Sequence, residues 1–463
     1  MSPLRAPQLV PVNVDAGAPT GPLEAWRQGL GHGGINSLPL PETVVGGVAR
    51  LRPRLIRIFI QEFFRVYPDH GCYDWTRLDP YMAALQRTGA RVMAALCIKP
   101  PPLYPTVNES VWRPTDLGEW QHLVATMVHR YSVAQPIVTH WEIGNEVDIG
   151  ENGGSPYLIT AGADYAEYYA STVEAVRRAY PQARVGGPAA ASVHSPVVAG
   201  FLQECGRHRW PLDFVSWHLY HSDPALHLAH LGTARRLLTQ AGLEEVEVMI
   251  TEWSRRLFDG VSVEEDAFDP RRAAAIATTA IRFADARVDG SFYYHIWDQT
   301  CYADDFRPFF SPAGVANMLR HWNEVPHRLG MFGVAGEARP QYFVYWMLSR
   351  LGSQRLASHS GHADVATLAG SDETGLRVLL SNYSVEGSAD RVAELRYEGL
   401  PPGVKHLSVW RIDGGQRWDG ADASLRLRPT ERREVDTNGA FQCQVWLPGD
   451  SVALVELRPA PTP

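Results

Sequence analysis

The amino-acid sequence predicts a (β/α)8 barrel joined to a smaller C-terminal β-sandwich, and three observations support this fold class. The 463 residues suit one large domain plus a smaller one. From about residue 30 to 300, eight short runs rich in β-branched residues alternate with longer segments of helical period, as expected for a parallel sheet covered on both faces and closed into a barrel. After about residue 345, short alternating runs separated by Gly, Pro and Asp are typical of a β-sandwich.

The expected barrel strands follow one another along the chain. They are "INSL" near Ile35 and the runs at 55–60, 91–98, 138–145, 184–189, 214–220, 247–253 and 291–297. The segment 115–131 places its apolar residues on one helical face, with Thr115 or Asp116 as its N-cap. A doubly wound open sheet is the main alternative, but a phosphate-binding glycine loop follows the first strand of such a sheet, whereas "GHGGINS" begins before the expected strand.

These patterns divide the chain into three expected segments. Residues 1–20 contain "QLVPVNVDA", which adds a strand to the sandwich, residues 21–345 form the barrel, and residues 346–463 form the sandwich. No stretch has the length and apolarity of a membrane span, and the N-terminus lacks the apolar core of a signal peptide. We therefore expect a cytoplasmic protein with no membrane partner.

Composition argues against several classes of function. The formal charge of −8 comes from 51 acidic and 43 basic residues without a long block of one sign, so nucleic acid is not an expected partner. The five cysteines are scattered and never form C-x-x-C, which argues against a disulfide framework and a zinc ribbon. The histidines of "HLYHSDPALHLAH" lack the spacing of a metal site. We expect neither a metal nor a cofactor.

Two expected barrel strands end on carboxylates. Active sites of such barrels lie at the C-terminal ends of the strands. The fourth expected strand ends on Asn145 and Glu146, and the seventh ends on Glu252, so the two glutamates face each other across the mouth. Opposed carboxylates suit glycoside hydrolysis, in which one group protonates the leaving oxygen while the other attacks the anomeric carbon or activates water. A separation of about 5 Å retains the configuration, and about 6.5–9.5 Å inverts it.

A third glutamate on the fourth strand has a different expected role. Glu142, Gly144 and Glu146 point to the same side, and because two residues along a strand span about 6.6 Å, Glu142 lies at least a full layer deeper in the barrel than Glu146. A carboxylate buried there needs a partner, for which Arg57 on the second strand is suited. We interpret Glu142 as structural.

Four motifs carry a resemblance to a known family. "WEIGNEVD", "VGGPA", "DFVSWHLY" and "ITEWS", in this order and spacing, resemble the retaining glycosidases of clan A, and among them glycoside hydrolase family 39, which holds β-xylosidases and α-L-iduronidases. The similarity extends from about Gly29 to the end of the chain. It includes "RLGMFGVAGEARPQYFVYWMLSRLG", which is similar to the family's link from barrel to sandwich, and the closing "SVALVEL".

The resemblance implies roles for the strand-end residues. Glu146 is the implied general acid/base and Glu252 the implied nucleophile, and Asn145 is expected to bind the sugar 2-OH. Tyr220 is expected to orient Glu252 and keep it ionised. The implied pKa of the acid is raised by its neighbours, and that of the nucleophile is lowered by its hydrogen-bond donors.

Further substrate-binding residues are expected around this pair. His218 lines the site, Arg57 lies beneath the nucleophile as a fixed positive charge, and the eighth strand offers His295 and Trp297 in an arrangement that departs from the family's. Trp297, at a strand end, is the better candidate for a sugar platform.

Other departures from the family concern the sugar contacts. The usual "EIWNEP" reads "EIGNEV", so Gly144 replaces a Trp, and Phe59 stands where a sugar-binding His is expected. These changes predict that simple β-xylosides are not the best substrates. Gln61, Glu62 and Trp253 either supply substitute contacts or pack at the rim.

We therefore expect a retaining exo-glycoside hydrolase that is β-xylosidase-like and acts on an oligosaccharide or glycoside without a cofactor. One alternative is another specificity, such as α-L-arabinofuranosidase, β-glucuronidase or α-L-iduronidase, or transfer to a sugar acceptor. A second is a non-catalytic carbohydrate-binding barrel. The sequence leaves the oligomeric state open, a homo-oligomer included.

Overall fold

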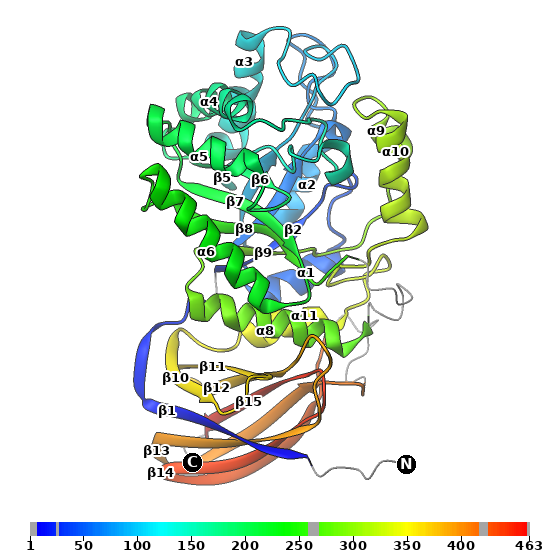
Figure 1. Ribbon diagram of the computed structural model, residues 1–463. Coiled ribbons are helices and arrows are strands. Elements are labelled where there is room, and N and C mark those ends of the chain that lie inside the picture. The colour runs from blue at the N-terminus through cyan, green and yellow to red at the C-terminus, as the bar shows by residue number, and fades with distance from the viewer. Residues whose placement is uncertain (1–6, 25–26, 258–267, 416–424, 461–463) are drawn as a thin grey trace.

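Eight parallel strands form a closed barrel in the computed structural model, which describes residues 7–24, 27–257, 268–415 and 425–460 (Figure 1). The strands follow the chain in order around the barrel, and the last pairs with the first. They are β2 (Gln28–His32), β3 (Leu55–Ile60), β4 (Arg91–Leu96), β5 (Val138–Ile143), β6 (Arg184–Ala190), β7 (Phe214–Tyr220), β8 (Glu247–Ser254) and β9 (Gly290–Tyr294). The predicted barrel is confirmed, and its closure rules out the open sheet.

The first barrel strand differs from the prediction. It is β2, whereas "INSL" near Ile35 follows the strand as a loop. Glycines hide this strand from a search based on β-branched residues. Gly29 is needed there, because a Cβ at this position would lie 2.7 Å from the Phe292 ring. The other seven predicted runs match strands β3 to β9 to within a few residues.

Helices surround the barrel (Figure 1). The longer ones are α1 (Glu42–Leu51), α2 (Leu78–Gln86), α3 (Leu117–Val128), α4 (Gly162–Ala179), α5 (Pro196–His208), α6 (Pro224–Ala241), α8 (Pro270–Ala286) and α11 (Pro340–Leu348). Asp116 is the N-cap of α3, as predicted, and its side chain accepts a hydrogen bond of 2.9 Å from the Glu119 amide. Within the described residues, no helix combines the length and apolarity needed to cross a membrane.

Short helical segments line the C-terminal ends of the strands. They are η2 (Glu62–Phe64), η4 (Gly150–Gly153), α9 (Ala303–Phe306), α10 (Pro312–Leu319) and η5 (Arg320–Glu324), whereas η3 (His129–Ala134) continues α3 and leads into the start of β5. The segment from α9 to η5 connects β9 to α11, and Figure 1 shows α9 and α10 standing at one side of the barrel.

The remaining strands form a seven-stranded sheet below the barrel (Figure 1). They are β1 (Gln8–Pro22), β10 (Gln354–Ser360), β11 (Val365–Asp372), β12 (Gly375–Asn382), β13 (Arg391–Ile412), β14 (Pro429–Leu447) and β15 (Ser451–Pro459). The N-terminal β1 pairs antiparallel with β10 and parallel with β13, so the sheet curls round on itself. The sheet-rich C-terminal region is confirmed, while its description as a sandwich and the boundaries at 20 and 345 stay predictions.

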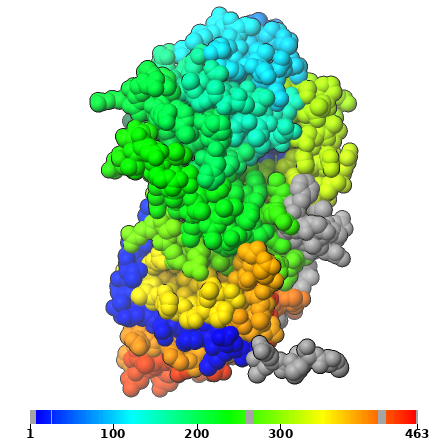
Figure 2. Space-filling model, in the orientation of Figure 1, coloured from blue at the N-terminus to red at the C-terminus, as the bar shows by residue number. Residues whose placement is uncertain are grey.

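Helix α8 of the barrel packs against this sheet. It packs on β11, β12 and β15, and the Thr278 hydroxyl donates a hydrogen bond of 2.9 Å to that of Ser381. Ser381 in turn donates to the Ala274 carbonyl at 2.9 Å. Figure 2 shows the barrel and the sheet region as one continuous body, with the N-terminal strand in blue lying on the sheet.

Candidate active site

A cavity of about 380 Å³ opens at the C-terminal ends of the barrel strands. Its floor and walls include Glu146 from the turn after β5 and Glu252 from β8. The other lining residues are Gly34, Phe59, Gln61, Asn145, Ile149, Asn152, Gly153, Gly154, Ala191, Leu219, Tyr220, Leu257, Tyr294, Asn317, Met318, His321, Trp322, His327 and Leu329. The two glutamates singled out from the sequence therefore share one cavity.

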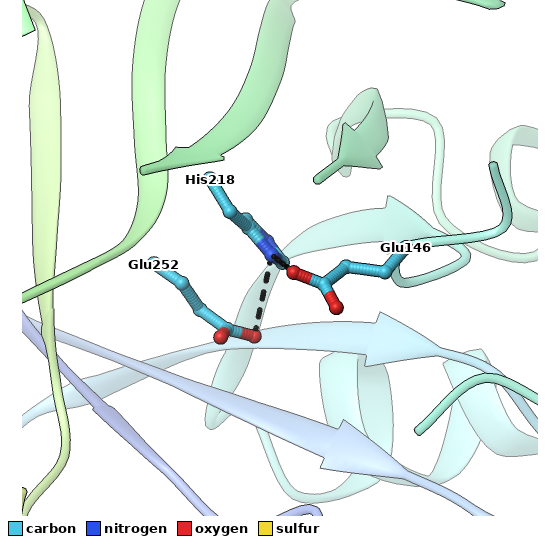
Figure 3. Close-up of side chains that lie close together, drawn as sticks. All are labelled: Glu146, His218 and Glu252. Carbon is cyan, nitrogen blue, oxygen red and sulfur yellow. Dashed lines mark hydrogen bonds and ion pairs between the residues drawn. The ribbon is translucent and has the colours of Figure 1, made fainter. Parts of the chain in front are cut away.

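The two carboxylates point toward each other (Figure 3). One oxygen of Glu146, one oxygen of Glu252 and a ring nitrogen of His218 all lie within 4.8 Å of one another. Nδ1 of His218 is 2.8 Å from Oε1 of Glu146 and 3.7 Å from Oε1 of Glu252. This separation of the carboxylates matches the roughly 5 Å of retaining glycosidases, not the roughly 6.5–9.5 Å of inverting ones.

The backbone turns sharply between β5 and Glu146. Gly144 has φ 91° and Glu146 has φ 42°, both in the left-handed region. The Glu146 amide donates a hydrogen bond of 2.8 Å to the Ala189 carbonyl, which holds this turn against β6. Glycine adopts this positive φ at position 144 without strain, whereas residues with a side chain avoid it. The glycine that replaces the family's Trp therefore suits this backbone conformation.

Arg57 lies fully buried beneath the pair and makes three contacts. Nε is 2.5 Å from Oε2 of Glu142, Nη1 is 2.7 Å from Oε1 of Glu252, and Nη2 is 2.8 Å from Oδ1 of Asn145. Glu142 is itself fully buried. The arrangement of Glu142 and Arg57 agrees with the prediction that this carboxylate is paired at a deeper level of the barrel.

Glu252 and Glu146 differ in their surroundings. Burial raises the pKa of Glu252, while Arg57 and the Tyr220 hydroxyl, whose oxygen lies 2.5 Å from Oε2, hold it down. Burial raises the pKa of Glu146 well above its usual range, and the charges of Glu252 and Asp148 raise it further. The two donors lower the pKa of Glu252, as the resemblance implied, but burial raises it by more, so the net direction is upward. Of the two glutamates, Glu252 has the stronger stabilisation of its ionised form.

His218 is buried and neutral between these carboxylates. Burial, assisted by the positive charge of Arg57, lowers its pKa well below the usual range. A neutral imidazole can share the proton of a protonated Glu146 through Nδ1. The site therefore favours one protonated and one ionised carboxyl group, the division of roles that an acid and a nucleophile require.

Asn145 lies on the cavity surface with its amide fixed. Its oxygen accepts from Arg57, and its nitrogen donates a hydrogen bond of 3.3 Å to the Gly153 carbonyl. Phe59 and Gln61 also line the cavity. Glu62 does not reach it, and burial raises the pKa of this carboxyl to about 8.

Of the residues predicted to bind substrate, Arg57 and His218 lie behind the carboxylates that line the cavity, and three others do not line it either. Trp253 is buried on the outer face of β8 against Phe283, because it follows the inward-pointing Glu252 and strand side chains alternate. Trp297 donates through Nε1 to the Val334 carbonyl at 3.2 Å. His295 is fully buried, with Nε2 2.8 Å from Asp298. None of these three side chains lines the cavity, so the geometry gives no support to their sugar contacts, which stay predictions.

Sequence reasoning missed the wall formed after β9. Tyr294 ends this strand, and Asn317, Met318, Trp322 and His327 come from the segment before α11. Trp322 lines the cavity, whereas Trp297 does not. Its segment carries no strand-end pattern or motif, so no local signal in the sequence indicated it.

The same three side chains resemble a set of metal ligands. Glu146, His218 and Glu252 each offer a ligand atom. However, both oxygens of Glu252 already accept hydrogen bonds, one of them from the Arg57 guanidinium. The positive charge of Arg57, 2.7 Å from Oε1 of Glu252, would repel a metal ion bound to this carboxylate. These residues therefore do not fit a resident metal ion.

The model of glycosyl hydrolases family 39 matches residues 52–417. The chain belongs to glycosyl hydrolases family 39. A beta-xylosidase from Geobacillus stearothermophilus is 24% identical over 274 residues, which cover 53% of this chain and 49% of that protein. The family 39 chain described here spans about half the length of the curated relatives that it matches.

Solved structures share the fold of this family 39 protein along nearly the whole chain. A glucosidase from Croceicoccus marinus has a TM-score of 0.75 and 19% identity, with 98% of this chain and 100% of that chain covered. A monomeric beta-xylosidase from Caulobacter crescentus has a TM-score of 0.73 and 19% identity, with 98% and 99% covered. At this level of identity the similarity shows the fold alone.

Proposed function

We propose that this family 39 protein is a retaining exo-glycoside hydrolase with Glu252 as nucleophile and Glu146 as general acid/base. The observation that carries the proposal is the opposed pair in one cavity, in which Glu252 alone has a bonded guanidinium and a tyrosine hydroxyl. These surroundings stabilise the ionised form of Glu252 and the protonated form of Glu146.

The mechanism proceeds in two displacements. Glu252 attacks the anomeric carbon, the bond to the glycosidic oxygen breaks, and Glu146 gives that oxygen its proton. The ionised Glu146 then removes a proton from water, whose oxygen attacks the anomeric carbon and releases Glu252. Two inversions give net retention, and atoms and charges balance without a cofactor.

Four neighbouring side chains support these roles. Arg57 and Tyr220 fix both oxygens of Glu252 and stabilise its charge as nucleophile and leaving group. His218 is in hydrogen-bonding distance of Glu146 and can share its proton. Asn145, held by Arg57, is placed to bind the 2-OH of a sugar attacked by Glu252.

The cavity favours an uncharged terminal sugar. Among the described residues that line it there is no lysine or arginine, and the three donor positions of Arg57 used here already bond to protein oxygens. A glucuronate or iduronate would place its carboxylate near two glutamates without a cation to balance it. We therefore propose a β-xylosidase-like enzyme for neutral glycosides or short oligosaccharides, and not a uronidase.

A panel of aryl glycosides tests this proposal. Xylose, arabinose, glucose and glucuronic acid derivatives are assayed with the wild type, Glu252→Ala and Glu247→Gln, the last being a matched control at the opposite end of β8. We expect release from neutral glycosides by the wild type and the control, and none by Glu252→Ala. A wild type inert toward the whole panel would instead favour a non-catalytic carbohydrate-binding barrel.

A further inference from the structure

Two segments far apart in the sequence form neighbouring parts of the cavity wall. Segment η4 and the glycine after it follow the catalytic turn of Glu146, while α10 and η5 follow β9. The first contributes Asn152, Gly153 and Gly154, and the second contributes Asn317, Met318, His321 and Trp322.

A buried carboxylate in η4 links these two segments. Oε1 of Glu151 accepts a hydrogen bond of 2.7 Å from the Ser311 amide, and Oε2 accepts another from the Ser311 hydroxyl. The Glu151 carbonyl accepts a bond of 3.3 Å from Nδ2 of Asn317. Because Ser311 is the N-cap of α10, the Glu151 carboxylate also lies where a helix favours negative charge.

The helix lacks a side chain where this carboxylate packs. A Cβ built on Gly314, in the first turn of α10, would lie 2.3 Å from Oε2 of Glu151 and 2.6 Å from its Cδ. The contact therefore depends on glycine at 314 as much as on the carboxylate at 151.

Gly153, two residues after Glu151 in η4, packs on the proposed acid/base. A Cβ on Gly153 would lie 2.1 Å from Oε2 of Glu146. The Gly153 carbonyl accepts from Asn145, and the Gly154 carbonyl accepts a bond of 2.7 Å from Nε2 of Gln61. A displacement of η4 would therefore reach the acid/base and the residue proposed to bind the sugar 2-OH.

We propose that Glu151 is a positioning residue, which ties α10 and η5 to η4 and thereby fixes both the substrate-contacting wall and the place of Glu146. The inference rests on the proposed function, since it assigns Glu151 a role in the same site. Glu151 does not line the cavity and acts through Ser311, Asn317 and Gly153.

The test uses Gly314→Ala and Glu151→Gln, with Gly232→Ala as a matched control. Gly232 lies in helix α6, where an added Cβ meets no atom within 4 Å. Alanine favours a helix more than glycine, so a defect in Gly314→Ala cannot come from a weaker helix. Glu151→Gln keeps the size of the side chain but removes its charge. Should Gly314→Ala not fold, this variant alone tests whether Glu151 positions the wall.

We expect faster hydrogen exchange of residues 303–324 and a fall in kcat/KM of roughly ten-fold, mainly through KM, in both test variants but not in the control. The alkaline limb of the pH profile should move to lower pH, because opening the wall lets water reach Glu146 and lowers its raised pKa. The groups that face Glu146, namely His218, Glu252, Arg57, Asp148, Tyr220 and Tyr294, are unchanged in all three variants.

Unchanged exchange and KM in Gly314→Ala and Glu151→Gln, relative to Gly232→Ala, would overturn the inference. The exchange measurement does not depend on turnover. An inert wild type would therefore defeat the proposed function, while exchange would still decide whether Glu151 holds the wall.

Discussion

The Tyr220 hydroxyl donates a hydrogen bond of 2.5 Å to Oε2 of Glu252, the carboxylate oxygen that Arg57 does not bond. The two donors together fix the orientation of Glu252 and offset part of the effect of burial on its pKa. The hydrogen bond from Tyr220 is strong because its acceptor is an ionised carboxylate, and hydrogen bonds to charged acceptors are stronger than those between neutral groups.

Replacing Tyr220 with Phe should lower kcat/KM by about ten- to a hundred-fold. Loss of the hydroxyl raises the pKa of Glu252, and the nucleophile must be ionised, so the acid limb of the kcat/KM profile should move to higher pH. Tyr169→Phe is the control, because its hydroxyl bonds to the Pro211 carbonyl away from the cavity. An acid limb in the same place for Tyr220→Phe and wild type would contradict this role.

Replacing Arg57 should separate stability from activity. Arg57→Met leaves Glu142 buried without its partner and should destabilise the fold by about 3–5 kcal/mol. Adding Glu142→Gln should restore much of the stability, because the buried charge is gone. Activity should stay low in the double variant, since Glu252 still lacks its guanidinium. Thermal unfolding and kcat/KM measured on the same samples check both statements, and recovery of activity with stability would count against the role.

Stability should fall as the pH drops from about 7 to 5, in part through His227. Burial lowers its pKa to about 4 in the folded protein, so between the unfolded value of about 6.5 and that pH the unfolded chain binds more protons. The loss at pH 5 is about 2 kcal/mol for this group. His227→Gln should lose less stability than wild type over this range when the free energy of unfolding is measured at each pH. The same pH dependence of the free energy of unfolding in His227→Gln and in the wild type would contradict this role of His227.

Phe59 should disfavour simple β-xylosides. It lines the cavity where the family resemblance places a sugar-binding His, and its ring lies 4.7 Å from the Arg57 guanidinium carbon. We expect another neutral aryl glycoside to have a higher kcat/KM than the β-xyloside, and Phe59→His to shift the ratio toward xylose. A wild-type kcat/KM that is higher for the β-xyloside than for every other glycoside would contradict this prediction.

The barrel was predictable because its strands are apolar runs with helices between them, but β2 was not. Its sequence "QGLGH" has two glycines, and the reason for Gly29 is the Phe292 ring more than 260 positions away. Such a contact exists only after the barrel closes. Local propensity cannot report it.

The centre of the site was predictable, and its walls were not. Glu146, Glu252 and Tyr220 lie at strand ends, where topology decides which side chains meet. Trp253 was a candidate for a sugar contact, although its alternation with Glu252 already pointed it outward. Trp322 lies in η5, which follows α10, and α10 begins beside the tertiary contact between Ser311 and Glu151, so the place of Trp322 in the cavity required the structure.

The products formed in the presence of azide test the central pair most directly. Azide should partly rescue both Glu252→Ala and Glu146→Ala on an activated aryl glycoside. We expect Glu252→Ala to yield a glycosyl azide of inverted anomeric configuration, from a single displacement, and Glu146→Ala to yield one of retained configuration, from attack on the glycosyl-enzyme. Exchanged configurations, or full activity of Glu252→Ala without azide, would contradict the assignment.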